Sequence, residues 1–270
     1  MDKVKLFVAI PTTSTVADSQ VYSLRAIEKK YGDRIEFVYP EKCVRRIFHD
    51  FARNALVDQF LATDCDIMWF LDSDICPPDN VLDLITEHGE KWKLAGAPYP
   101  VFMTPTGDKD CAVLMCVYKK GPHGLHITSV PNDGVEFVDG LATGCMFIKR
   151  EAIEGMPKPY FEFKFDPETR LMTEGEDLGF CRKMSEKGLQ FFIDYSMVCK
   201  HYKNVCLLEV NNYAINFANQ KIKQFDAMVK SQVEALAQRY TALQRELVST
   251  QAKLAEATKP KSRLILPENF

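Results

Sequence analysis

Apolar residues in the first hundred positions alternate between short continuous runs and stretches with helical spacing. Four runs have the length and composition of buried strands: KLFVAI (5–10), RIEFVYP (34–40), DIMWFL (66–71) and KLAGAPYP (93–100). Between them, residues 19–30 and about 44–61 carry apolar side chains three and four positions apart, which is typical of amphipathic helices. Strands and helices in this alternation predict an α/β domain built around a mostly parallel, Rossmann-like sheet.

The pattern changes from about residue 111. Two apolar segments, CAVLMCVYK and HGLHITSV, are joined by the turn KGPHG, which predicts a small antiparallel excursion. The segment PPDNVLDLITEHG (77–89) is expected to be helical because prolines open it and a glycine closes it. Further along, LATGCMFIKREAIEGM predicts a strand and a helix, EGEDLGFCRKMSEKG a helix that ends at Gly188, and LQFFIDYSMVCKH a final strand.

Residues 212–258 contain neither proline nor glycine and repeat apolar residues at spacings of three and four. The step from Val229 to Val233 is a four where a three is due, which is a stutter in the heptad pattern. At about 1.5 Å per residue, such a helix is longer than a compact domain can cover. A coiled coil with another copy of the chain is therefore favoured over a helix folded back on the first domain. We expect an α/β domain at 1–211, an oligomerisation helix at 212–258 and a tail at 259–270.

Composition narrows the class of protein. Of the 270 residues, 46% are hydrophobic and the formal net charge is -3, so no overall basic field indicates nucleic-acid or membrane binding. The nine cysteines form no CxxC pair and several lie inside apolar runs, which indicates reduced core thiols and a cytoplasmic location. No run approaches the roughly 20 apolar residues that a membrane span requires.

The first candidate chemistry is the pair Asp72 and Asp74, at the end of the apolar run IMWFL. Two carboxylates at the mouth of a buried strand repel each other, and a hard divalent cation such as Mg²⁺ or Mn²⁺ removes that repulsion. Oxygen ligands together with a substrate diphosphate are the usual shell of these ions. The alternative is structural, because Asp74 could cap a helix that begins near Pro77.

Three further features lie near predicted strand ends or helix starts, where open α/β sheets bind ligands. Glu176 and Asp177 follow a glycine. Either their carboxylates only stabilise the positive end of the helix dipole, or one of them is a base whose pKa is raised by its acidic neighbour. His201 follows the last predicted strand and is either an ordinary surface or core residue or a further metal ligand. Arg53 is either a solvated helix residue or a partner for a diphosphate.

Taken together, these segments resemble the GT-A glycosyltransferases, and within them the small single-domain enzymes common in bacteria and their phages. The resemblance covers residues 5 to about 205, and the order of its motifs is more specific than any one of them. The motifs are FVAIPTT (7–13), FARNAL (51–56), FLDSDICPP (70–78), LATGCMFIKREA (141–152), EGEDLGFCRKMSEKG (174–188) and CKHYK (199–203).

The resemblance implies a role for each matched residue. Asp72 and Asp74 match the DxD motif that holds Mn²⁺ or Mg²⁺ against the diphosphate of a nucleotide sugar, and His201 matches the histidine that often completes the metal shell. Asp74 is favoured for direct metal contact, and Asp72 either joins it or binds the sugar or ribose of the donor instead. Asp177, beside Glu176, matches the acidic pair on the acceptor side, with Asp177 as the base. The remaining matched positions contact the donor, through the nucleotide or the donor-sugar pocket: Pro11, Thr12, Arg53, Ser73, Thr143 and Gly144.

The resemblance leaves several points open. The Asp-Asp-Gly-Ser signature of many inverting members is replaced by YPEKCVRR, so the nucleobase is not assigned and the donor is a UDP- or GDP-sugar. Inversion of configuration is favoured over retention. The acceptor is a glycan, a lipid, a protein, a small molecule or a modified base in phage DNA.

Two other functions compete with the transferase hypothesis. A sugar nucleotidyltransferase is disfavoured because IPTTSTVADS contains neither glycine nor lysine. A non-catalytic oligomeric scaffold with a degenerate α/β head is the other alternative.

Overall fold

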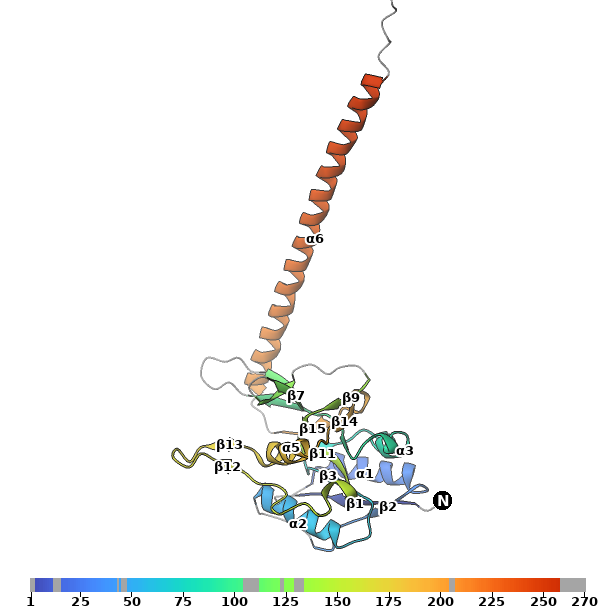
Figure 1. Ribbon diagram of the computed structural model, residues 1–270, viewed down its shortest axis with the longest axis vertical. Helices are drawn as coiled ribbons and strands as arrows, with labels where there is room; N and C mark the ends of the chain where they lie inside the picture. Colours follow the sequence, from blue (N-terminus) through green and yellow to red (C-terminus); the bar gives the residue numbers. More distant parts are fainter. Residues whose placement is uncertain are drawn as a thin grey trace, which may run out of the picture. The chain divides into compact units, whose positions relative to one another are not determined.

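The computed structural model describes residues 3–11, 16–42, 44, 48–103, 112–121, 124–128, 134–203 and 207–257. The chain divides into two compact units, Met1–Val205 and Cys206–Phe270. The first contains a seven-stranded sheet and its covering helices, and the second contains one long helix (Figure 1). The predicted α/β class, with a mostly parallel sheet, an antiparallel excursion and a long C-terminal helix, is confirmed.

The central sheet has the strand order β2-β1-β3-β11-β5-β14-β9. Five strands share one direction, because β1 is parallel to β2 and β3, β14 is parallel to β5, and β11 is antiparallel to both β3 and β5. Strand β9 also runs against its neighbour. The strands are β1 (Val4–Ala9), β2 (Ile35–Val38), β3 (Ile67–Leu71), β5 (Leu94–Gly96), β9 (Val135–Val138), β11 (Cys145–Lys149) and β14 (Phe191–Asp194).

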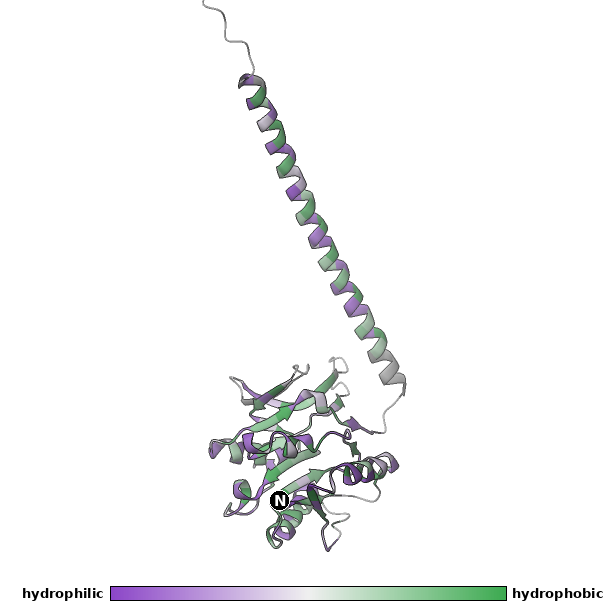
Figure 2. Ribbon diagram, turned by 90° about the vertical axis from the view of Figure 1, so that its right-hand side faces the viewer, coloured by the Kyte–Doolittle hydropathy of each residue, from purple (hydrophilic) through white to green (hydrophobic). Residues whose placement is uncertain are grey.

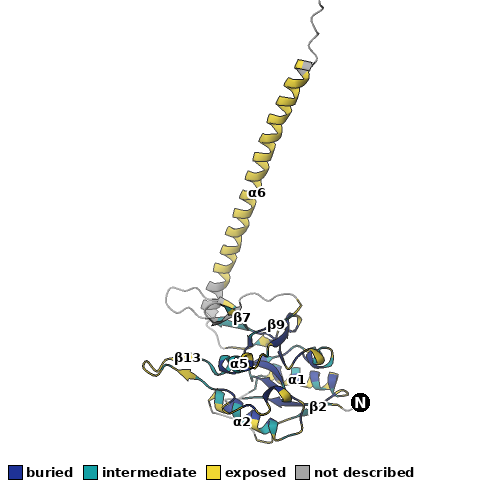
Figure 3. Cartoon of the chain, viewed as in Figure 1, coloured by how far each residue is buried: buried dark blue, intermediate teal, exposed yellow. Residues whose placement is uncertain are grey.

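Helices cover both faces of this sheet, and the side-chain alternation of the strands explains why. Leu6 and Val8 of β1 face a core that includes α1 and α3, whereas Phe7 and Ala9 face a core that includes α2, α4 and α5. The sheet is therefore buried on both sides, which accounts for its near-continuous apolar strands (Figure 3). These helices are α1 (Asp18–Tyr31), α2 (His49–Leu61), α3 (Asp83–Thr86), α4 (Arg150–Ile153) and α5 (Glu176–Glu186).

Smaller strand pairs complete the first unit. The antiparallel excursion contains β7 at its centre, paired with β6, β8 and β10. A hairpin, β12 with β13, leads into α5, and β4 pairs with β15. The bounds are β4 (Ile75–Cys76), β6 (Pro100–Met103), β7 (Ala112–Gly121), β8 (Gly124–Thr128), β10 (Gly140–Leu141), β12 (Lys164–Phe165), β13 (Met172–Glu174) and β15 (Lys200–His201).

Three predicted elements differ from the structure. The helix expected over 77–89 is reduced to α3, because the indole of Trp92 donates to the Leu84 carbonyl at 2.8 Å and so takes an acceptor that a longer helix would use. The helix expected from about 44 begins only at His49. The final strand is split, because the Asp194 carboxylate accepts the Ser196 N–H and a short 3₁₀ turn separates β14 from β15.

The second unit is α6 (Leu207–Ala257), a helix of 51 residues. Apolar and polar residues alternate along it in turns (Figure 2), and its large apolar side chains are exposed in the single chain. Among the helices described, none is both long and apolar enough to cross a lipid bilayer. The exposed apolar residues at three-four spacing are Ile222, Phe225, Val229, Val233, Leu236, Tyr240, Leu243, Leu247 and Leu254.

Candidate functional site

The predicted site residues gather at the carboxyl ends of β1 and β3. Asp72 follows β3 directly, and the antiparallel partner β11 begins beside it, with Cys145 opposite Leu71. The loop before β11 is therefore brought to the same edge, where the Asp72 N–H donates to the Gly144 carbonyl at 2.9 Å. A strand running against the others thus adds Thr143 and Gly144 to an edge that otherwise consists of strand carboxyl ends.

Arg53 binds two of the predicted carboxylates. Its guanidinium donates to both oxygens of Asp72, at 3.0 and 3.2 Å, and lies 3.5 Å from Glu176 Oε1. The Arg53 side chain is 3% exposed, so the solvated-helix interpretation is wrong. Burial acts to lower the pKa of Arg53, but Asp72 and Glu176 outweigh burial and hold that pKa above its ordinary value. Arg53 therefore positions the first DxD carboxylate and the first residue of α5 together.

Asp177 is the second residue of α5, and its carboxylate accepts the Leu178 N–H at 2.8 Å. Burial raises the pKa of Asp177, and the negative charge of Glu176 raises it further. Because Arg53 occupies Glu176, the two adjacent carboxylates are in different environments: one is ion-paired and the other has a raised pKa. That difference suits Asp177 for proton transfer.

Asp74 and His201 meet through the pairing of β4 with β15. His201 lies opposite Ile75, and the Tyr202 N–H donates to the Asp74 carbonyl at 2.9 Å. His201 Nδ1 is 2.8 Å from the Pro100 carbonyl, which can only accept, so Nδ1 carries the hydrogen. In the neutral ring Nε2 is then an acceptor, and it lies 3.5 Å from Asp74 Oδ2, which is also an acceptor. A cation beside both atoms, or a proton on Nε2, would make this contact favourable.

These donors fit a hard or borderline divalent cation. A carboxylate oxygen with an imidazole whose other nitrogen is fixed by a backbone carbonyl is a common arrangement of metal ligands. The described residues contain no group of three or more metal-binding side chains, so the protein supplies two donors at this point. Ions of the Mg²⁺ type often bind through one or two protein groups and complete their shell with waters and substrate phosphates.

Lys203 also contacts the second aspartate. Its ammonium forms an ion pair with Asp74 Oδ2, the same oxygen that faces His201. Burial acts to raise the pKa of Asp74. When the His201 ring is protonated, its hydrogen bond and charge act with those of Lys203 to outweigh burial and lower that pKa to about 2. Asp74 therefore remains ionised at neutral pH.

The two aspartates of the DxD motif have different partners. Both oxygens of Asp72 bind Arg53, whereas Asp74 faces His201 and Lys203. Of the predicted metal ligands, Asp74 and His201 are brought together, and metal contact by Asp72 stays a prediction.

Gly144 allows Tyr99 to enter the site. A Cβ on Gly144 would lie 2.6 Å from Tyr99 Cζ and Oη, which is closer than real Cβ contacts allow. The Gly144 N–H donates to Tyr99 Oη at 3.2 Å, and the Tyr99 ring stands edge-on to His201 with centroids 5.1 Å apart. Tyr99 thus links the Gly144 loop to the imidazole.

The other predicted residues have less direct positions. Thr143 is buried beside Gly144, and Pro11 is half-buried at the end of β1. The Ser73 carbonyl accepts the Ala17 N–H at 3.1 Å, so this residue holds the motif to the start of α1. Thr12 lies outside the described residues.

Three residues that contribute to the site were not identified from the sequence: Gln20, Tyr99 and Lys203. The Gln20 side-chain amide donates to the carbonyls of Asp72 and Ile75 at 2.6 and 2.8 Å, so it holds the turn between them. Tyr99 lies shortly after the end of β5, and Lys203 lies shortly after the end of β15. Their positions just beyond strand ends were the signal in the sequence that could have identified them.

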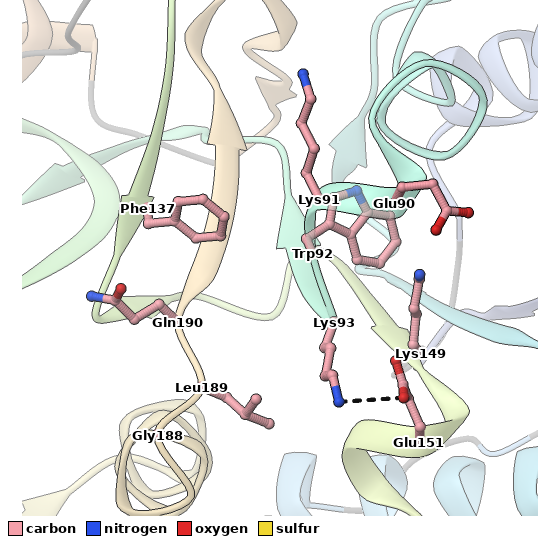
Figure 4. A pocket seen from close by; sticks show the side chains of 10 residues that line it. All are labelled: Glu90, Lys91, Trp92, Lys93, Phe137, Lys149, Glu151, Gly188, Leu189 and Gln190. Carbon is pink, nitrogen blue, oxygen red and sulfur yellow. Dashed lines mark ion pairs between the residues drawn. The ribbon is translucent and has the colours of Figure 1, made fainter.

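A separate hollow of about 440 Å³ lies at the amino ends of β5 and β14, the opposite edge from Asp72 (Figure 4). Lys149 lies over the Trp92 ring there, and Lys93 pairs with Glu151 at 3.3 Å. This hollow contains none of the predicted site residues.

Comparisons with known proteins concern the fold. No protein-family model and no curated protein matches the sequence. The crystal structure of A197 from STIV matches with a TM-score of 0.50 and 23% identity, over 74% of this chain and 86% of A197. The crystal structure of GalNAc-T7 with UDP, GalNAc and Mn²⁺ matches with a TM-score of 0.46 and 12% identity, over 76% of this chain and 45% of that protein. At these identities, the comparison shows that the matched part of this chain has the fold of A197, and it shows nothing about activity.

Proposed function

We propose that this chain is a metal-dependent GT-A glycosyltransferase that transfers a sugar from a UDP- or GDP-sugar to an acceptor hydroxyl. One observation carries the proposal. When the His201 ring is neutral, its Nε2 is an acceptor, and it faces another acceptor, Asp74 Oδ2, at 3.5 Å. The order of motifs along the first unit, from FVAIPTT to CKHYK, supports the same class.

Each protein group has a defined task in this reaction. Asp74 and His201 would hold Mn²⁺ or Mg²⁺, which when bound supplies positive charge beside the leaving diphosphate. Asp177 takes the proton of the acceptor hydroxyl as the oxygen–carbon bond forms and the bond from the anomeric carbon to the diphosphate breaks. Arg53 holds Glu176 in place beside Asp177, and burial together with the charge of Glu176 raises the pKa of Asp177.

Inversion of configuration is part of the proposal, with Asp177 and the leaving group on opposite faces of the sugar. Pro11, Thr12, Ser73, Thr143 and Gly144 are assigned to the donor side, as the resemblance implies. The acceptor class is left open between a glycan and a modified base in phage DNA. Six described cysteines are free thiols, five of them buried, which supports a cytoplasmic protein, within the host cell if a phage encodes it.

The metal site is tested with Asp74→Asn and His201→Ala. Each variant should bind Mn²⁺ at least tenfold more weakly in calorimetry, since even outer-shell changes at metal sites reduce affinity by about that factor. Each should also lose Mn²⁺-dependent hydrolysis of the UDP- or GDP-sugar that most stabilises the wild type in a thermal-shift screen. Asp79→Asn, at an exposed aspartate of the same segment, is the matched control. Unchanged Mn²⁺ affinity in both variants would remove the proposed site.

We further propose that residues 212–258 join copies of the chain as a coiled coil, with residues 1–211 as the catalytic domain and 259–270 as a tail. The exposed apolar stripe of α6 supports this role, because a helix of 51 residues with such a stripe is stable in water when the stripe is covered. Leu236→Lys with Leu243→Lys should give monomers in analytical ultracentrifugation, and Gln238→Lys should not. Hydrolysis retained in those monomers would contradict the scaffold alternative.

A further inference from the structure

Lys203 lies on the metal side of the site, where its ammonium contacts Asp74. Strand β15 ends at His201, and Lys203 follows it by two residues. Lys200, the first residue of β15, is exposed and lies opposite Cys76. The Lys203 ammonium and His201 Nε2 both reach Asp74 Oδ2. One carboxylate oxygen therefore has a permanent cation of the chain at a position where a metal ion would bind.

The charge of Lys203 also acts on the buried thiol of Cys116, whose backbone N–H donates to the Tyr99 carbonyl at 3.0 Å. Burial raises the pKa of the Cys116 thiol to about 12, Asp177 and Asp72 add to that rise, and Lys203 opposes it. The charges of Asp177, Asp72 and Lys203 therefore all affect the pKa of this one buried thiol. The Lys203 side chain is 56% exposed, so it can leave Asp74 without disturbing a packed core.

We propose that Lys203 is an internal competitor of the metal: its ammonium occupies Asp74 until a divalent cation displaces it, and the released ammonium then binds the diphosphate of the donor. A lysine ammonium is a compact point charge that binds phosphate oxygens well. When both cations are held by this one aspartate oxygen, their positive charges repel each other at contact distance, so each weakens the binding of the other. The proposal rests on the metal site formed by Asp74 and His201.

The proposal predicts two effects of opposite sign for Lys203→Met. Mn²⁺ alone should bind the full-length variant about fivefold more tightly than the wild type. The reason is that the ion pair between Lys203 and Asp74, whose free energy corresponds to a factor of about five in affinity, no longer competes with the metal. At saturating Mn²⁺, UDP or GDP should bind the variant about fivefold more weakly, because a cation near the diphosphate is missing. Loss of folding would weaken both interactions, so the opposite signs identify competition.

The experiment is calorimetry on the wild type, Lys203→Met, Lys203→Arg, Lys200→Met and Asp74→Asn. Lys203→Arg should behave as the wild type, and Lys200→Met should change neither affinity. Unchanged or weaker Mn²⁺ binding in Lys203→Met, with Asp74→Asn impaired, overturns the competition while leaving the metal site intact. If Asp74→Asn binds Mn²⁺ as the wild type does, the proposed metal site itself is wrong. Tighter Mn²⁺ binding without any loss of nucleotide affinity overturns the second role of Lys203.

Discussion

Replacing Arg53 by methionine tests whether the site is held together by one buried cation. Methionine keeps much of the side-chain volume and removes the charge that binds Asp72 and Glu176. In the native protein Arg53 is 3% exposed, Asp72 23% and Glu176 12%. The variant therefore leaves two largely buried carboxylates close together without a counter-ion.

The expected loss of stability follows from the distances. At an effective dielectric of about 20, unit charges at the observed 3.0 Å attract by roughly 5 kcal/mol. Removing Arg53 also removes the free energy needed to desolvate it, so the net change is smaller. Breaking a buried pair by deleting one partner typically destabilises by about 3–5 kcal/mol. Because water reaches part of Asp72, we expect the lower end, about 3 kcal/mol.

Urea denaturation of the full chain followed by tryptophan fluorescence is a suitable assay. Both tryptophans, Trp69 and Trp92, are buried in the first unit, so the signal reports that unit. With a typical slope of about 2 kcal/mol per molar urea, the midpoint should fall by more than 1 M. Adding Asp72→Asn to the Arg53 variant should recover part of the loss, since one unpaired charge is then gone. A loss of stability below about 1 kcal/mol would refute the view that the ion pair between Arg53 and Asp72 is shielded from solvent.

Two further predictions concern the loop and the base. Gly144→Ala should destabilise the protein by about 1–3 kcal/mol in the same urea assay, because the new Cβ overlaps Tyr99, whereas Gly89→Ala, which has open space, should not; equal effects would contradict the close approach. In Glu176→Gln the acid limb of the pH–rate profile should move to lower pH, because the charge that raises the pKa of Asp177 is lost, and an unmoved limb would argue against Asp177 as the base.

The amino-acid sequence predicted those parts of the fold that depend on local pattern. The buried strands β1 and β3 and the helix α5 lie where apolar runs and helical spacing indicated. The short length of α3 was not predictable, because it depends on a hydrogen bond from Trp92, eight residues away from the Leu84 carbonyl. The direction of β11 was also hidden, since a buried strand has the same apolar composition whichever way it runs.

The role of each site residue depends on contacts with residues that are far away in the sequence, and the local sequence pattern does not show these contacts. Asp72 and Asp74 are two positions apart and chemically identical, so the DxD motif by itself does not show which side chains each of them contacts. Asp72 is bound by Arg53, 19 residues earlier in the chain, and Asp74 by His201 and Lys203, which β15 delivers through its pairing with β4. A bidentate guanidinium occupies both oxygens of the first carboxylate, whereas the second faces a monodentate ammonium and an acceptor nitrogen. In the metal site that we propose, the second aspartate is therefore the one that would exchange its partner for a metal ion, whereas Arg53 fixes the position of the first.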